Sequence, residues 1–363
     1  MNVLIIEPYF TGSHAAWASG YQKFSSHNIE ILSLKGQFWK WRMHGGAVTL
    51  ARMFNDSDLK PDVIIATDML DVTTFLSLTR KRTGDIPIAF YFHENQFAYP
   101  WSPDDRDVSQ KRDKHYGFIN YASALAADWC FFNSRYNHNT FLNSLQPFLK
   151  HFPDYNELAS IKKIAKKSSV LPLGLDLSRF DEHHLDEQNE PPLILWNHRW
   201  EHDKNPGDFF KAIDAVENAG LDFQLALLGE NFRQVPQEFE KALKKYQHKI
   251  KHYGFAKSYT EYAQWLWRAN VLPVTSIHDF FGISVVEAIY CGCTPLLPKR
   301  LAYPELLPED EAFYFYNDFE NLVEKLKSVL KKRGETDQLK CFVEKFKWEK
   351  MAPMYDAELE RLM

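Results

Sequence analysis

Short apolar runs alternate with longer stretches of helical periodicity along the whole chain. In the first half, near-continuous apolar runs lie at residues 3–6, 29–34, 62–66, 86–92, 129–132 and 170–173. The second half repeats this plan at residues 193–196, 223–228, 251–253, 271–275, 294–297 and 312–316. Strands that are apolar on both faces are typical of parallel sheets covered by helices. The pattern predicts an α/β fold of two doubly wound, Rossmann-like halves.

One polar segment separates the halves. Residues 181–190 are mostly polar and lead into two prolines, which makes them the best linker. We expect a first domain over residues 1–180, completed by a C-terminal helix at about 346–363, and a second domain over residues 181–345.

Three helix starts are readable. Asn205-Pro206 predicts an N-cap followed by proline at the first helical position, and Ser258-x-x-Glu261 predicts a capping box. After the first strand, Ser13 is a candidate cap of the next helix, and Gly12 beside it would let a ligand approach the backbone closely.

Composition narrows the class of protein. The 363 residues are 45% hydrophobic and 25% charged, as in soluble globular proteins, and no stretch approaches the roughly 20 apolar residues of a membrane span. The opening MNVLIIEPYF lacks the basic region and cleavage site of a signal peptide, so we expect a buried strand there. The four cysteines contain no CxxC pair, and reduced, buried thiols in a cytoplasmic protein are expected.

The charge distribution bears on nucleic-acid binding. A net charge of −5 argues against a general nucleic-acid binder, but basic clusters lie at residues 80–82, 111–114, 162–167 and 241–251. These clusters are either solvated faces or parts of one positive face for a phosphate backbone.

The richest stretch is HDFFGISVVEAIYCGCTP at residues 278–295. It predicts a loop, a short helix that carries Glu287, a glycine stop and a strand. The carboxylate of Asp279 and the backbone N–H groups of Phe281, Gly282 and Ile283 would meet at the helix N-terminus, which favours an anion. Amides for a diphosphate and carboxylates for hydroxyls suit a nucleotide-sugar.

A simpler interpretation of the same stretch is local. Ser284-x-x-Glu287 also fits a capping box, in which the two side chains only stabilise the helix start.

Polar residues also follow other predicted strands, where parallel α/β domains place their ligand crevices, here expected to face one cleft. A polar block, His93, Glu94, Asn95 and Gln96, follows the fourth strand directly and indicates a site.

The first strand of the second half is followed by Asn197, His198, Arg199 and Lys204. Two cations before a helix N-terminus suit a pyrophosphate. The alternative is surface ion pairing with neighbouring acidic residues, which contributes only about 0–1 kcal/mol.

Two further strands end at Gly229 and near Tyr253. These residues are candidates for contacts with a base and ribose, or are plain turns.

The segment FWKWRMHGG at residues 38–46 interleaves aromatic and basic side chains. Trp39, Lys40, Trp41 and Arg42 suit stacking on a base and pairing with phosphate. Alternatively, one tryptophan packs under the sheet and the cations are solvated.

These motifs together resemble the retaining glycosyltransferases of the GT-B fold, in particular family 4, over the length of the chain. The resemblance implies that Arg199 and Lys204 hold the donor diphosphate and that Glu287 binds the ribose. It also implies that Asp279 faces the donor sugar, where the family usually has Glu. His93 would lie near the reacting centre, and Gly12 would line the phosphate.

A narrower resemblance is to the tRNA-queuosine α-mannosyltransferase group. It is carried by LIIEPYFTGSH, YFHENQFAYP, FNSRYN, WNHRWEHDKNP and the stretch at 278–295. It implies GDP-mannose as donor, queuosine in tRNA(Asp) as acceptor and catalysis without a metal or cofactor, in the cytoplasm. With this resemblance, Glu94, Asn95, Gln96 and the residues at 39–42 are expected to contact the acceptor.

Other functions stay open at this point. A family 4 enzyme with a different nucleotide-sugar and a lipid, polysaccharide or protein acceptor would share the donor motifs. A catalytically silent RNA- or nucleotide-binding module would explain the basic and aromatic segments. An NAD-dependent oxidoreductase is disfavoured because GxGxxG is missing.

Overall fold

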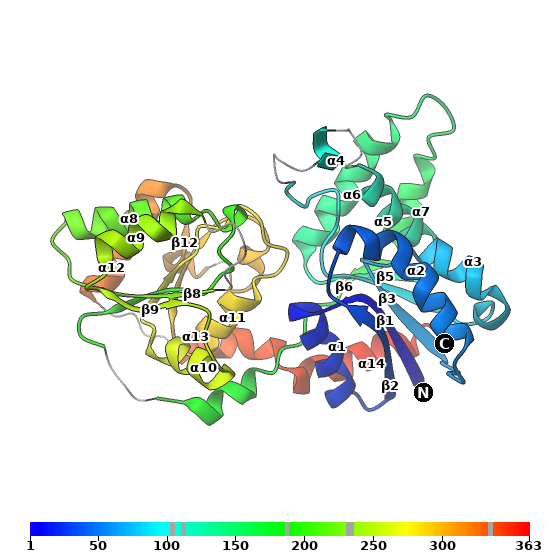
Figure 1. Cartoon of the computed structure of the whole chain (residues 1–363), viewed down its shortest axis with the longest axis horizontal. Coiled ribbons are helices and arrows are strands. Elements are labelled where there is room, and N and C mark those ends of the chain that lie inside the picture. Colours follow the sequence, from blue (N-terminus) through cyan, green and yellow to red (C-terminus); the bar gives the residue numbers. More distant parts are fainter. Residues whose placement is uncertain (102–105, 110–113, 186–188, 230–235, 309, 333–336) are drawn as a thin grey trace. The chain divides into compact units, whose positions relative to one another are not determined.

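The computed structural model describes residues 1–101, 106–109, 114–185, 189–229, 236–308, 310–332 and 337–363. The chain divides into two compact units, each built on its own sheet (Figure 1). Unit 1 comprises residues 1–175 and 348–363, and unit 2 comprises residues 176–347. Among the described helices, none has the length and apolar character that crossing a membrane requires.

Unit 1 contains a six-stranded sheet in the order β2-β1-β3-β4-β5-β6, and every pairing is parallel. Its strands are β1 (Asn2–Phe10), β2 (Asn28–Lys35), β3 (Val63–Thr67), β4 (Ile88–Phe92), β5 (Trp129–Phe132) and β6 (Ser168–Val170). Its helices are α1 (Gly12–Phe24), α2 (Trp39–Asn55), α3 (Val72–Thr83), α4 (Arg106–Ser109), α5 (Lys114–Ala126), α6 (Arg135–Leu149), α7 (Ala159–Lys166) and α14 (Trp348–Glu360). The strand order reverses between β1 and β3, which is where such sheets bind ligands.

The C-terminal helix α14 completes unit 1, as expected, and Figure 1 shows it in red next to α1. The Trp348 indole lies so close to Gly20 and Gly174 that a Cβ atom at either glycine would fall within 2.3 Å of it. Farther along, Asp356 accepts hydrogen bonds from Tyr21 and Ser25 of the α1 region. Packing and hydrogen bonding therefore both hold the C-terminus on unit 1.

Unit 2 repeats the architecture with the strand order β12-β11-β10-β7-β8-β9, again parallel. Its strands are β7 (Leu193–Trp196), β8 (Gln224–Leu228), β9 (Ile250–Gly254), β10 (Val271–Pro273), β11 (Thr294–Pro298) and β12 (Phe315–Tyr316). Its helices are α8 (Pro206–Asn218), α9 (Gln237–Tyr246), α10 (Tyr259–Arg268), α11 (Ile283–Tyr290), α12 (Phe319–Lys331) and α13 (Asp337–Val343). Here the order reverses between β7 and β10.

Two predicted strands differ from the observed ones. The strand predicted at residues 170–173 lies instead at residues 168–170. It ends before Pro172, which has no N–H group to continue the hydrogen-bonded ladder. In the run at 312–316, residues 312–314 form a 3₁₀ turn and only β12 pairs.

The observed domain boundary also lies earlier than the expected residue 180. Residues 177–183 form a 3₁₀ helix in unit 2, where the Phe180 ring contacts Tyr259 and its carbonyl accepts from the Trp267 indole. This segment therefore packs with the second sheet, while part of the expected linker, residues 186–188, lies outside the described residues.

Two of the three predicted caps are confirmed. The side chains of Asn205 and Ser258 accept hydrogen bonds from the N–H groups of Asp208 and Glu261. The Ser13 prediction is wrong, since α1 begins at Gly12 after Thr11 and no side chain caps it. Cys341 is exposed, contrary to expectation, whereas the other three thiols are buried as expected.

Candidate active site

A buried lysine occupies the switch point of unit 2. Lys204 ends a 3₁₀ turn after β7 and is only 8% exposed. Its ammonium donates to the backbone carbonyl of His278 (2.9 Å) and lies 3.2 Å and 3.3 Å from carboxylate oxygens of Asp203 and Asp279. The structure thus brings together Lys204 and Asp279, which lie far apart in the sequence.

The electrostatics keep both members of this pair charged. Burial alone would lower the pKa of Lys204, but the carboxylates of Asp279 and Asp203 hold it above its ordinary value. Burial likewise opposes ionisation of Asp279, yet Lys204 and the Phe281 N–H group hold the pKa of this carboxyl below its ordinary value. Asp279 also accepts from the Tyr303 hydroxyl at 3.2 Å.

Helix α11 starts without a side-chain cap. Gly282 precedes it with φ of 94°, and the Ser284 hydroxyl, inside the first turn, contacts His198 Nδ1 at 2.9 Å instead. The capping-box interpretation of Ser284 and Glu287 is therefore wrong.

The three predicted amide groups at the start of this helix differ in their hydrogen bonding. The N–H group of Phe281 donates to Asp279 Oδ1 at 3.1 Å, so it does not point at an anion as predicted. Within the described part of the chain, the N–H groups of Gly282 and Ile283 have no partner. Two of the three predicted amides are thus available to a ligand.

Glu287 lies one turn inside α11 and accepts from the Tyr262 hydroxyl at 2.6 Å. Burial raises the pKa of this carboxyl to about 7, although the Tyr262 bond opposes the shift. A half-buried carboxylate with one strong donor retains acceptor capacity for hydroxyl groups of a ribose.

Asn197 and His198 lie beside the lysine with open polar atoms. Both are buried, and among the described residues Asn197 Oδ1 and His198 Nε2 have no hydrogen-bond partner. Burial and then the charge of Lys204 lower the pKa of His198 to about 4, so its ring is neutral. Unpartnered buried polar atoms cost free energy that a ligand would recover.

Arg199 differs from Lys204. Its side chain is 47% exposed and pairs with Glu201 at 3.2 Å, which is the ion pair considered from the sequence. Exposure leaves the guanidinium able to turn toward a ligand, and its charge lowers the pKa of Lys204, against the two carboxylates.

Gly229 directly follows β8, and Tyr253 is the last residue but one of β9, so both lie at strand ends as predicted. A Cβ atom at Gly229 would lie 2.3 Å from the His198 carbonyl oxygen, so this position requires glycine for close packing. Tyr253 is half-buried with its ring against Trp200. The residue after Gly229, Glu230, lies outside the described residues.

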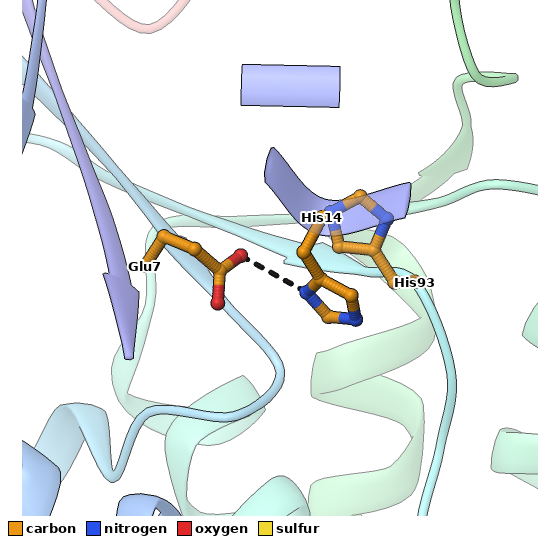
Figure 2. Close-up of side chains that lie close together, drawn as sticks. All are labelled: Glu7, His14 and His93. Atoms are coloured by element: carbon orange, nitrogen blue, oxygen red, sulfur yellow. Dashed lines mark hydrogen bonds and ion pairs between the residues drawn. The ribbon is translucent and has the colours of Figure 1, made fainter. Parts of the chain in front are cut away.

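Unit 1 has a second polar cluster at its own switch point, shown in Figure 2. Glu7 on β1 is fully buried, and its two carboxylate oxygens accept from the Tyr9 N–H group and from His14 Nδ1 at 3.0 Å. The His14 ring lies 4.2 Å from that of His93, centroid to centroid.

The two histidines of this cluster carry different charges. Burial alone would lower the pKa of His14, but Glu7 outweighs it and the pKa rises to about 9. Burial and the charge of His14 hold the pKa of His93 well below its ordinary value. Near neutral pH, His14 is therefore an imidazolium ion beside a neutral His93.

Asp68 is a site candidate that the sequence analysis missed. It directly follows β3, is fully buried, and accepts from the His93 N–H group through Oδ1, while Oδ2 has no partner among the described residues. Burial raises the pKa of this carboxyl well above its ordinary value, although the His14 charge opposes this. The signal that identified His93, a polar residue directly after a buried strand, was also present at Asp68.

Glu7 and His14 were also missed. Glu7 lies inside an apolar strand and His14 inside a helix, so no strand end marks them. Gly12 nearby has φ of 51° and open space where a Cβ would lie, which is consistent with close approach of a ligand.

The rest of the polar block after β4 has a largely internal role. The Asn95 side chain donates to Asn137 (2.8 Å), and the backbone N–H group of Gln96 donates to the Asn120 side chain. Glu94 is half-buried and accepts from the Gln96 side chain. Gln96 Oε1 is buried and has no partner among the described residues, so this side chain keeps an acceptor for a substrate. The acceptor roles of Glu94, Asn95 and Gln96 stay predictions.

Glu7, His14 and His93 each offer one ligand atom within 4.8 Å of the others, as a metal site would. A metal ion requires neutral imidazoles, whereas His14 keeps its proton in the bond with Glu7. The cluster therefore suits a bound proton better than a metal ion.

The predicted acceptor segment splits into packed and exposed residues. Trp39 packs against Trp101 and Tyr116, so one tryptophan is packed, as in the alternative. The solvated cations of that alternative are not found at Lys40, which pairs with Asp107. Trp41 is 63% exposed.

Phe38 and Arg42 belong to the same segment as the exposed Trp41. Phe38 is 76% exposed and adopts φ of 54°, which is unusual for a residue with a side chain. The Arg42 guanidinium donates to the Lys35 carbonyl. The exposed aromatic pair is thus Phe38 and Trp41, of which only Trp41 was predicted from the sequence.

The described residues of the basic clusters are mostly exposed, including Arg80, Lys81, Lys162 and Lys163, as expected of solvated faces. Arg82 is an exception, since it packs over the Phe54 ring and donates to backbone carbonyls of residues 54, 57 and 59. Lys111 and Arg112 lie outside the described residues.

Known proteins match both units. Residues 2–175 match the family described as tRNA-queuosine alpha-mannosyltransferase N-terminal, and residues 179–345 match glycosyl transferases group 1. A tRNA-queuosine alpha-mannosyltransferase of Drosophila melanogaster is 34% identical over 334 residues, which are 90% of this chain and 86% of the relative. The chain belongs to the tRNA-queuosine α-mannosyltransferase family. The family and enzyme class implied by the sequence resemblance are confirmed.

Solved structures agree on the fold. A UDP-forming α,α-trehalose-phosphate synthase from Burkholderia xenovorans superposes with a TM-score of 0.68 at 13% identity, covering 99% of both chains. A sucrose-phosphate synthase from Thermosynechococcus elongatus gives 0.69 at 14% identity, covering 100% of this chain and 99% of the other. The predicted GT-B fold is therefore confirmed.

Proposed function

We propose that this protein transfers mannose from GDP-mannose to the queuosine base of tRNA(Asp), with retention of the anomeric configuration. The proposal rests on the family and on one observation in unit 2. A buried lysine ammonium lies at the switch point beside Asp279, close in sequence to the N–H groups of Gly282 and Ile283 that open α11. A cation and free amides at a helix start suit a nucleotide diphosphate.

The diphosphate takes up negative charge as the glycosyl bond breaks. Lys204, the amides of α11 and an inward-turned Arg199 would stabilise that charge, and such preorganised charge is usually the largest catalytic contribution. These residues supply positive charge without a metal ion, so we propose metal-independent transfer. Glu287 would hold the ribose hydroxyls, and Asn197 and His198 would contact the donor.

Retention is proposed to follow front-face attack, in which the leaving phosphate oxygen takes the acceptor proton. The structure adds one competitor, because the carboxyl group of Asp68 has an open oxygen beside His93. If Asp68 were the nucleophile of a double displacement, donor without acceptor would leave mannose covalently attached to the protein. We expect no such adduct by intact-protein mass spectrometry.

The acceptor is proposed to stack on Phe38 and Trp41. Sequence-specific RNA recognition commonly splays out loop bases and stacks them on aromatic rings. The two exposed rings, with Arg42 next to Trp41, suit that role. With a tRNA acceptor, we propose a cytoplasmic location.

A transfer assay tests the function. Purified protein is incubated with GDP-mannose or UDP-glucose and with tRNA that contains or lacks queuosine. We expect sugar incorporation only with GDP-mannose and queuosine-containing tRNA. Transfer independent of queuosine would favour another acceptor, and absence of transfer from any donor would favour the silent binding module.

A further inference from the structure

Unit 1 holds a charged group that the mechanism above does not use. His14 and Glu7 form a buried ion pair whose histidine ring lies 4.2 Å from His93 and is tilted 40° to it. The indole of Trp17 packs edge-on against His93 at 4.8 Å, and the Tyr91 ring lies 5.0 Å away, so three aromatic neighbours hold the His93 ring. Among the described residues, His93 Nε2 is buried and has no hydrogen-bond partner.

We propose that the Glu7–His14 ion pair is a positioning pair, which keeps His93 neutral and oriented so that its open Nε2 binds a hydroxyl group of the substrate sugar or cyclopentenediol. The inference deepens the proposed function and rests on it for the identity of the substrate.

The charge arrangement carries the first step of the inference. Burial lowers the pKa of His93, and an imidazolium ion at this distance disfavours a second positive charge further, so His93 is neutral near neutral pH. A neutral imidazole has one donor and one acceptor nitrogen, and a hydroxyl group can bond to either kind. A doubly protonated His93 would be able only to donate.

The neighbouring carboxylates carry the second step. His14 faces Glu7 on β1, Asp68 after β3 and Glu94 after β4, all of which favour its charged form. Without the His14 cation, these buried or half-buried carboxylates would lose their common positive partner. His14 thus compensates the negative charge of these carboxylates, while His93 binds the substrate.

The pH dependence of Glu7→Gln distinguishes this role from a purely structural one. In the wild type, the His14 cation persists until pH rises through about 9, so turnover should hold to that pH and then fall. In Glu7→Gln the main partner that raises the His14 pKa is gone, and burial lowers it. The alkaline limb should therefore move down by about two pH units or more.

His14→Gln removes the titrating group itself. Turnover near pH 7.5 should fall by about tenfold to a hundredfold, as expected when a contact residue is no longer held in position. GDP affinity should stay unchanged, because nucleotide contacts are assigned to unit 2. His151→Gln, an exposed histidine of unit 1, is the matched control and should change neither quantity.

NMR of histidine ring carbons tests the ion pair without any substrate. The wild-type His14 signal should titrate near pH 9 and move to lower pH in Glu7→Gln. The His93 midpoint should rise in His14→Gln, since the neighbouring cation is lost. If these titrations hold while no sugar is transferred, the proposed function fails and the ion pair stands.

Two results would overturn the inference. One is a loss of turnover in folded Glu7→Gln that is the same at every pH, with no movement of the alkaline limb. The other is stoichiometric Zn²⁺ bound to Glu7, His14 and His93, with activity lost to a chelator, which would replace the bound proton by a metal ion.

Discussion

Each unit has a buried cation beside a neutral histidine, at the switch point of its own sheet. In unit 1 the His14 cation lies among Glu7, Asp68 and Glu94, next to a neutral His93. In unit 2 the Lys204 cation lies between Asp203 and Asp279, next to a neutral His198. In both, burial and then the charge of a neighbouring buried cation lower the pKa of a histidine at the switch point.

The difference lies in the kind of cation. An ammonium whose pKa is raised above its ordinary value stays charged at every pH of interest, which suits a permanent negative ligand such as a diphosphate. An imidazolium with a pKa of about 9 is bound to its carboxylate and can lose its proton. We infer that unit 2 is built to hold charge, whereas unit 1 is built to orient hydroxyl groups.

Lys204→Ala should produce the largest effect. Turnover is expected to fall by about 10²–10³, as when one charge-stabilising donor is removed. The free energy of unfolding should also fall by about 3–5 kcal/mol, because Asp203 and Asp279, whose side chains are only 15% and 18% exposed, lose their cation. Thermal melts measured beside steady-state kinetics separate the two losses.

The control for this test is Lys211→Ala, since this lysine is 70% exposed in α8 and should leave both quantities unchanged. A folded Lys204→Ala protein with near-normal turnover would contradict the assignment of Lys204 to the donor diphosphate.

Trp41→Ala should affect the acceptor alone. Loss of one base-stacking ring is expected to raise KM for tRNA by about tenfold, while donor hydrolysis and GDP affinity stay the same. Trp39→Ala should instead lower stability, because its ring packs against Trp101 and Tyr116. Tyr155→Ala, at a 90% exposed aromatic of the same unit, is the control. Equal losses of acceptor use and donor hydrolysis in Trp41→Ala would indicate a folding defect.

Glu287 should make donor binding depend on pH. Burial holds the pKa of this carboxyl at about 7, so the charged form, which accepts ribose hydroxyls, increases as pH rises. GDP affinity measured by calorimetry should therefore improve by about tenfold between pH 6 and 8. In Glu287→Gln this improvement should disappear, and any remaining slope belongs to the nucleotide itself. An identical slope in both proteins would contradict the assignment.

Alanine substitutions at two serines should have the smallest effects, and they distinguish a helix cap from a residue of the site. Ser258→Ala removes a true cap and should lower the free energy of unfolding by about 1 kcal/mol without changing GDP affinity. Ser284→Ala removes the bond to His198 instead, so GDP affinity should fall. Unchanged affinity in Ser284→Ala would show that His198 is oriented without this hydroxyl.

Periodicity and strand ends predicted most of the fold and half of the site. Both sheets, the caps at Asn205 and Ser258 and the site residues Lys204 and Asp279 follow from local signals, because polar residues after buried strands meet at one sheet edge. The capping box at Ser284 was wrong because one pattern fits two structures. Only the start of α11 at Ile283 decides between them.

The sequence by itself determined the fold class, the family and which residue types carry the charges, since these depend on local order and composition. Only the tertiary structure decided which charges meet. The pairing of Glu7 with His14, the open atoms of Asp68 and His93, and the burial of Lys204 between two carboxylates depend on strand order. The physical reason is that burial and distance set each protonation state, and neither can be read from spacing along the chain.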